Sequence, residues 1–161
     1  MIPPHLNADY GDMLSALNDA GVEWLLIGGY AVIAHGYPRL TKDIDIWVRP
    51  TKENATRVLR ALAAFGAPDH GVSIDDLSRS GSVVQFGVPP CRIDIVTSAQ
   101  ALTFEAAWAH RVTQEVDGIR VHILSLDDLL ANKRSVGRPG DLADVASLEL
   151  RRRQARKNPP V

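Results

Sequence analysis

One stretch decides the fold of this chain: Leu26-Ile-Gly-Gly-Tyr-Ala-Val-Ile-Ala-His-Gly-Tyr-Pro-Arg-Leu-Thr-Lys-Asp-Ile-Asp-Ile-Trp-Val48. It begins with a short apolar run that ends at Gly28-Gly29, and a short helix is expected to start on this glycine pair. After a turn around Pro38, acidic and apolar residues alternate from Asp43 to Arg49, as they do in a half-buried strand. The stretch therefore predicts a strand, a helix and a second strand.

Three aspartates of two predicted strands are candidate metal ligands. Asp43 and Asp45 lie two positions apart, so their side chains project from the same face of the sheet. The stretch Arg92–Val96 repeats the alternation, and a neighbouring strand would bring Asp94 beside the other two. The pattern offers no basic residue on their own face, so a divalent cation is expected to relieve their mutual repulsion. Carboxylates and substrate phosphates are the ligands that Mg²⁺ favours, and three carboxylates suit a two-metal site for phosphoryl transfer.

The glycine pair Gly28-Gly29 is a candidate phosphate-binding turn. Glycines between a strand and a helix let phosphate oxygens approach the backbone, and the N-terminus of a helix presents free N–H groups. The turn is not a P-loop, because no Gly-Lys-Ser/Thr follows it. Arg39 and Thr41 precede the acidic strand and are candidates for contact with phosphate or acceptor, with hydrogen bonding within the loop as the alternative.

The remaining pattern predicts an α+β domain with a mixed, mostly antiparallel β-sheet and flanking helices. The segment from Ala67 to Gly81 is polar and is expected to be an irregular, mobile loop beside the site. Helices are predicted over residues 6–20, 29–35, 51–65, 104–110, 125–136 and 141–153, and strands over residues 23–27, 43–49, 83–88, 92–97, 112–116 and 119–123.

Composition indicates one globular domain over residues 1–150, followed by a basic, flexible C-terminal tail over residues 151–161. The chain has 161 residues, of which 45% are hydrophobic and 23% are charged. The tail carries five basic and no acidic side chains, whereas the other 150 residues carry 13 basic and 19 acidic ones. Such a tail can meet a nucleic-acid backbone or remain solvated. A single cysteine and the lack of long apolar runs lead us to expect a cytoplasmic protein without a membrane partner.

The spacing of Gly28-Gly29, Asp43-Ile-Asp45 and Asp94 resembles the signature of the nucleotidyltransferase superfamily that includes DNA polymerase beta. The pattern Gly-Gly-Tyr-Ala-Val-x-x-His-Gly-x-x-Arg-x-Thr-x-Asp-Ile-Asp more closely resembles small bacterial nucleotidyltransferases related to abortive-infection toxins and minimal nucleotidyltransferases. Two later motifs, which are less specific, resemble the C-terminal region of those proteins: Leu126-Asp-Asp-Leu-Leu-Ala-Asn-Lys133 and Gly137-Arg-Pro-Gly-Asp-Leu-Ala-Asp144.

The resemblance implies a role for each motif. Gly28 and Gly29 would hold the triphosphate of an NTP such as ATP, and Asp43 and Asp45 would bind Mg²⁺, with two ions expected. Asp94 would complete the metal site and help to deprotonate the attacking hydroxyl.

The later motifs are assigned in the same way. Lys133 matches a lysine that those toxins place near the phosphates; pairing with Asp128 or Glu149 is the alternative. One or both of Asp141 and Asp144 match a late acidic motif whose role the resemblance leaves open.

The resulting hypothesis is a Mg²⁺-dependent nucleotidyltransferase. It would move an NMP from an NTP to a hydroxyl of RNA (tRNA-like) or protein and release pyrophosphate, plausibly as the toxin of a toxin–antitoxin or defence pair with a cognate antitoxin as partner. A non-catalytic or partner-dependent nucleotide-binding module is the main alternative, and a metal-dependent hydrolase is a third. The base of the NTP, the acceptor and the oligomeric state stay open.

Overall fold

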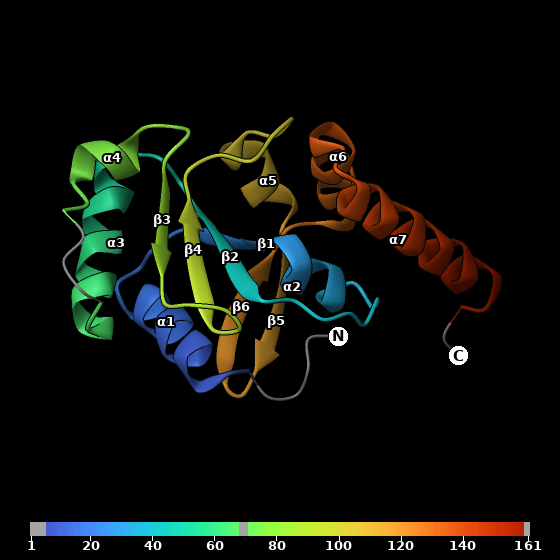
Figure 1. Cartoon of the computed structure of the whole chain (residues 1–161), viewed down its shortest axis with the longest axis horizontal. Coiled ribbons are helices and arrows are strands. Elements are labelled where there is room, and N and C mark those ends of the chain that lie inside the picture. The colour runs from blue at the N-terminus through green and yellow to red at the C-terminus, as the bar shows by residue number, and fades with distance from the viewer. Residues whose placement is uncertain (1–5, 68–70, 160–161) are drawn as a thin grey trace.

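The computed structural model describes residues 6–67 and 71–159 (Figure 1). No helix in these residues combines the length and the apolar character needed to cross a membrane. The helices and strands are α1 (Ala8–Asp19), β1 (Trp24–Ile27), α2 (Gly28–Ala34), β2 (Asp43–Val48), α3 (Lys52–Phe65), α4 (Ile74–Ser78), β3 (Val83–Phe86), β4 (Arg92–Val96), α5 (Phe104–His110), β5 (Val112–Val116), β6 (Ile119–Ile123), α6 (Leu126–Val136) and α7 (Pro139–Lys157).

The strands form one mixed sheet in the order β3-β4-β2-β1-β6-β5. Three neighbouring pairs are antiparallel, namely β1–β2, β3–β4 and β5–β6. The pairs β1–β6 and β2–β4 are parallel. The expected α+β fold with a mixed, mostly antiparallel sheet is confirmed. The parallel pairing of β2 with β4 matters most, because it aligns the two strands that carry the acidic residues.

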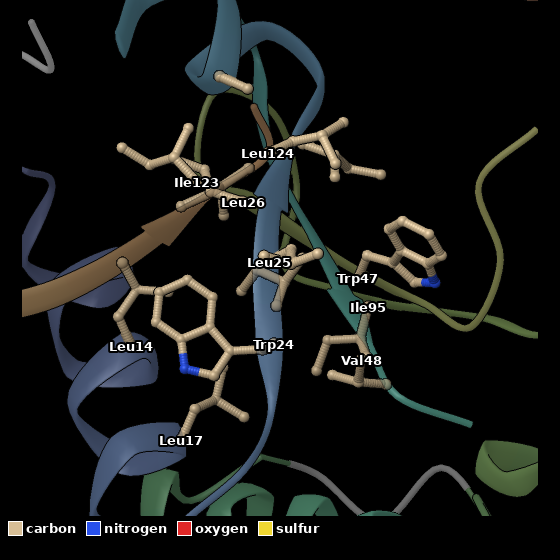
Figure 2. Close-up of a cluster of buried hydrophobic side chains, with 14 of the residues drawn as sticks. Leu14, Leu17, Trp24, Leu25, Leu26, Trp47, Val48, Ile95, Ile123 and Leu124 are labelled. Atoms are coloured by element: carbon tan, nitrogen blue, oxygen red, sulfur yellow. The ribbon is translucent and has the colours of Figure 1, made fainter. Parts of the chain in front are cut away.

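The core fills both faces of the sheet. On one face, Leu14 and Leu17 of α1 lie against Trp24 of β1, as Figure 2 shows, and all three side chains are fully buried. On the other face, the ring of Trp47 meets the ring of Phe104 from α5 edge to face, with 5.2 Å between ring centres. Two of the three tryptophans are thus packing residues of the core.

Local sequence signals explain where several elements begin and end. The Thr51 side chain accepts a hydrogen bond from the backbone of Asn54 at the start of α3, and Ser125 caps α6 in the same way. The hairpin between β5 and β6 turns at Asp117 and Gly118, which have φ values of +52° and +75°. Two successive positive φ values are what a two-residue hairpin turn requires.

Two expectations about the less regular parts need correction. The segment 67–81 contains helix α4, whose N-terminus is closed by a capping box between Ser73 and Asp76 and whose Leu77 is fully buried; residues 68–70 of this segment lie outside the described residues. Helix α7 continues to Lys157, so residues 151–157 are helical instead of forming a flexible tail. Figure 1 shows this helix running away from the sheet.

Candidate functional site

The three aspartates singled out by the sequence lie together. In the parallel pair β2–β4, Asp45 is directly opposite Asp94, and Asp43 is opposite Arg92. One carboxylate oxygen from each of Asp43, Asp45 and Asp94 lies within 4.8 Å of the others. The alternation of β2 also buries the isoleucines of that strand on the opposite face. Two strands therefore display three carboxylates on one face because their registers coincide.

Arg92 is a site residue that the sequence pattern did not reveal. Its Nη2 lies 2.7 Å from Oδ2 of Asp43, and its Nε lies 3.0 Å from Oδ1 of Asp94. The expectation that no basic residue shares the face of the aspartates was wrong. Arg92 precedes Asp94 by two positions, so the same period-2 rule places both on one face. That spacing places Arg92 on the face of Asp94, whereas its contact with Asp43 depends on the register of β2 with β4.

The surroundings of Asp45 disfavour the charged form of its carboxyl group. Burial, together with the negative charges of Asp43 and Asp94, raises the pKa of Asp45 to about 7, and the positive charge of Arg92 opposes this shift only in part. One arginine cannot neutralise three carboxylates, so the group has an excess of negative charge. Clustered carboxylate oxygens with such an excess fit a hard divalent cation such as Mg²⁺.

Side chains from neighbouring segments lie close against both glycines of the pair. Gly28 has φ +67°, and a Cβ atom added there would overlap the carboxylate of Asp45. A Cβ on Gly29 would come within 2.8 Å of Oγ1 of Thr41, and the Thr41 hydroxyl donates to the carbonyl oxygen of Asp43 at 3.1 Å. The start of α2 is therefore packed directly against the acidic strand.

Arg39 also lies beside Gly29. Its Nε and Nη2 lie 3.1 Å and 3.2 Å from the two carboxylate oxygens of Asp144 in α7. Its Nη1 donates to the carbonyl oxygen of Leu40 at 3.0 Å. The structure thus brings the expected Arg39 to the glycine pair and links it to the late acidic motif.

Lys133 is enclosed by the two aspartates of the late acidic motif. Its ammonium lies 2.9 Å from Asp144 and 3.3 Å from Asp141, and the residue is only 5% exposed. These pairs replace the alternative pairing with Asp128 or Glu149, whereas the expected place of Lys133 near the phosphates stays a prediction. The turn between α6 and α7 lays the first two turns of α7 beside α6.

Arg138 lies in that turn, directly before α7. Its Nε is 2.8 Å from Oδ2 of Asp141, yet 76% of its side chain is exposed. The pKa of Arg138 is raised mainly by this hydrogen bond. The late acidic motif thus reaches the glycine pair through the contact of Asp144 with Arg39.

Three solved structures with a similar fold are described as nucleotidyltransferases or as nucleotidyltransferase-like. A Thermotoga maritima protein assigned to that class matches with a TM-score of 0.59 and 17% identity, over 98% of this chain and 97% of that chain. The lincosamide antibiotic adenylyltransferase LnuA, solved with lincomycin bound, gives 0.58 and 16%, over 89% and 96%. An antigenic nucleotidyltransferase-like protein from Paracoccidioides brasiliensis gives 0.53 and 15%, over 87% and 74%. These likenesses show the fold.

A search of curated proteins gave no match. A family described as nucleotidyltransferases of unknown function, DUF6036, matches residues 9–154, which is nearly the whole chain and includes every residue of the site. This protein therefore belongs to the nucleotidyltransferase family DUF6036.

Proposed function

We propose that this protein transfers a nucleoside monophosphate from an NTP to a hydroxyl group of RNA or protein. The observation that carries the proposal is the meeting of three carboxylates with a glycine pair, Gly28-Gly29, within one contact network. Phosphoryl transfer needs positioning and neutralisation of charge more than a protein nucleophile. The acceptor oxygen attacks the α-phosphorus, the bond to the bridging β-phosphate oxygen breaks, and pyrophosphate leaves with the electron pair.

Each residue of the site has a proposed role. Asp43, Asp45 and Asp94 are the proposed ligands of Mg²⁺, which would neutralise charge on the phosphates when bound. Asp94 is also the proposed acceptor of the proton from the attacking hydroxyl. Gly28 and Gly29 are the proposed contacts of the triphosphate through their backbone at the start of α2.

The basic end of α7 favours an acceptor that carries negative charge. Arg151, Arg153, Arg156 and Lys157 are exposed side chains of this helix, and a tRNA-like acceptor would meet them with its backbone. A role as the toxin of a toxin–antitoxin or defence pair, neutralised by a cognate antitoxin, remains part of the proposal.

A labelling assay tests the proposal. The protein is incubated with each α-labelled NTP and Mg²⁺, together with either total RNA or cell lysate, and the Asp43→Ala/Asp45→Ala variant is the control. Label on RNA or protein that disappears with the control variant supports the proposal and identifies both base and acceptor. The absence of label with every NTP, together with NTP binding, would instead favour a non-catalytic nucleotide-binding module. One observation favours this second function: Arg92 contacts two of the three carboxylates.

A further inference from the structure

Five charged side chains form a continuous chain of contacts beside the aspartate cluster. Four ion pairs link them in the order Arg39–Asp144–Lys133–Asp141–Arg138. The series joins the loop before β2 to α6 and to the first turn of α7. It contains three cations and two carboxylates, so the group keeps one net positive charge.

The middle of this series is buried, whereas its two ends are open. The side chains of Lys133, Asp141 and Asp144 are 7%, 7% and 6% exposed, but those of Arg39 and Arg138 are 33% and 76% exposed. A lysine that is enclosed in this way has its donors directed at two carboxylates. The arginines are the members that a ligand can reach.

Arg39 borders the proposed path of the phosphates, and Arg138 is joined to it. Nη2 of Arg39 lies 3.4 Å from the position that a Cβ would take on Gly29. Arg138 is linked to Arg39 through Asp141, Lys133 and Asp144. Within the described residues, neither Nη1 nor Nη2 of Arg138 has a hydrogen-bond partner. An arginine offers several N–H donors in a planar fork that matches phosphate oxygens. The Nη1 and Nη2 donors of Arg138 are available to a ligand.

We propose that Arg39 and Arg138 bind the polyphosphate of the NTP and the departing pyrophosphate, and that Lys133 is a positioning residue that acts only through Asp141 and Asp144. The inference rests on the proposed function, because it assigns residues to the leaving group of that reaction. Asp141 contacts Lys133 through one oxygen and Arg138 through the other, whereas Asp144 contacts Arg39 through both oxygens and Lys133 through Oδ2. Lys133 thereby sets the distance between two guanidinium groups without contacting the ligand.

Chemical modification of lysines tests the part of the proposal that concerns Lys133, without any substitution. The native protein is treated briefly with acetic anhydride, with and without magnesium pyrophosphate, and acetylation at each lysine is measured by mass spectrometry. We expect Lys133 to stay unmodified in both samples, while the exposed Lys42 and Lys52 react in both. Rapid modification of Lys133 that pyrophosphate prevents would overturn the proposal, because it would show an accessible ammonium in contact with the ligand.

Binding of magnesium pyrophosphate, measured by calorimetry, tests the arginines. We expect Arg138→Gln to weaken binding by about tenfold, which is the effect that loss of one hydrogen bond to a charged group usually has. The melting temperature should change little, because the side chain is exposed. Arg39→Gln should weaken binding to a similar degree. Arg60→Gln, at an exposed arginine of α3, is the matched control and should bind normally. Unchanged affinity in both site variants would overturn the proposal.

A double-mutant cycle separates positioning from direct contact. If Lys133 acts only through the arginines, Lys133→Met should weaken pyrophosphate binding in the wild type but not in the Arg39→Gln/Arg138→Gln background. An equal further loss in that background would show direct contact and overturn the positioning role. If Lys133→Met does not fold, the modification experiment decides the point. Because these readouts are binding and reactivity, they hold even if the labelling assay finds no nucleotidyl transfer, so the two proposals can fail independently.

Discussion

The backbone of Gly28 lies directly against the carboxylate of Asp45. Gly28 has φ +67°, and any Cβ at this position would overlap an oxygen of Asp45. Ile27, the residue before the glycine, is paired with Asp45 across β1 and β2, which explains the close approach. The first glycine of the pair is therefore required by the acidic strand itself, whatever ligand the turn receives.

Substitution of Gly28 should damage the aspartate cluster as well as stability. Gly28→Ala pays the usual cost of a positive φ, about 1–2 kcal/mol, and in addition displaces the Asp45 carboxylate. Gly21→Ala is a matched control, because Gly21 has φ +71° and nothing lies within 4 Å of its added Cβ. Urea denaturation should show a larger loss for Gly28→Ala than for Gly21→Ala, and Mg²⁺ titration should show weaker binding only for Gly28→Ala. Equal losses of stability in the two variants would contradict the contact.

Binding of Mg²⁺ should stabilise the wild-type protein through Asp45. The cluster has more carboxylates than cations, so we expect added Mg²⁺ to raise the melting temperature and EDTA to reverse the effect. Asp45→Asn keeps the shape of the side chain and removes one charge, so the variant should fold, lose most of the response to Mg²⁺ and lose nearly all nucleotidyl transfer. Asp75→Asn, at an exposed acid of α4, should behave like the wild type. A folded Asp45→Asn variant with normal turnover would refute the metal assignment.

Two half-buried histidines should contribute to a loss of stability in acid. Burial lowers the pKa of His35, although its hydrogen bond to the carbonyl oxygen of Leu124 opposes the shift. Burial also lowers the pKa of His122, with help from the charges of Arg111 and Arg120. At these two groups the unfolded chain binds protons more readily than the folded one, so their contribution to the free energy of unfolding decreases as the pH falls through about 6.5, the usual histidine value. Asp45, whose pKa is raised to about 7, contributes in the opposite sense.

The matching experiment compares chemical denaturation at pH 7.5 and pH 5.5. The His35→Gln/His122→Gln variant should lose less stability between these two values than the wild type, because neither glutamine can take up a proton. The same pH dependence in both proteins would show that other groups control the acid response.

Loss of the Lys133 charge should destabilise the fold strongly. Lys133→Met leaves Asp141 and Asp144 buried with fewer cations, and breaking a buried ion pair on one side costs about 3–5 kcal/mol. Lys52→Met, at an exposed lysine of α3, should change stability by less than about 0.5 kcal/mol. Urea denaturation measures both variants, and a Lys133→Met variant as stable as Lys52→Met would mean that the buried pairs contribute little.

The sequence by itself determined the features that depend on neighbouring residues. Two-residue spacing placed Asp43 and Asp45 on one face, and the glycine pair marked the end of β1 and the start of α2. Local chemistry also identified the cap at Thr51 and the hairpin turn at Asp117. The capping box at Ser73 is equally local and could have been found, so the irregular loop expected there reflects an overlooked signal instead of a limit of the sequence.

Only the tertiary structure decided which charges meet. The register of β2 with β4 put Arg92 between two aspartates, and nothing in the spacing along the chain specifies which residue of one strand lies opposite another. The turn between α6 and α7 enclosed Lys133 and left Arg138 exposed, although the sequence presents both as cations near the same motif. Partners of a charged side chain depend on packing between segments far apart in the chain, whereas strand and helix periodicity depends on the backbone alone.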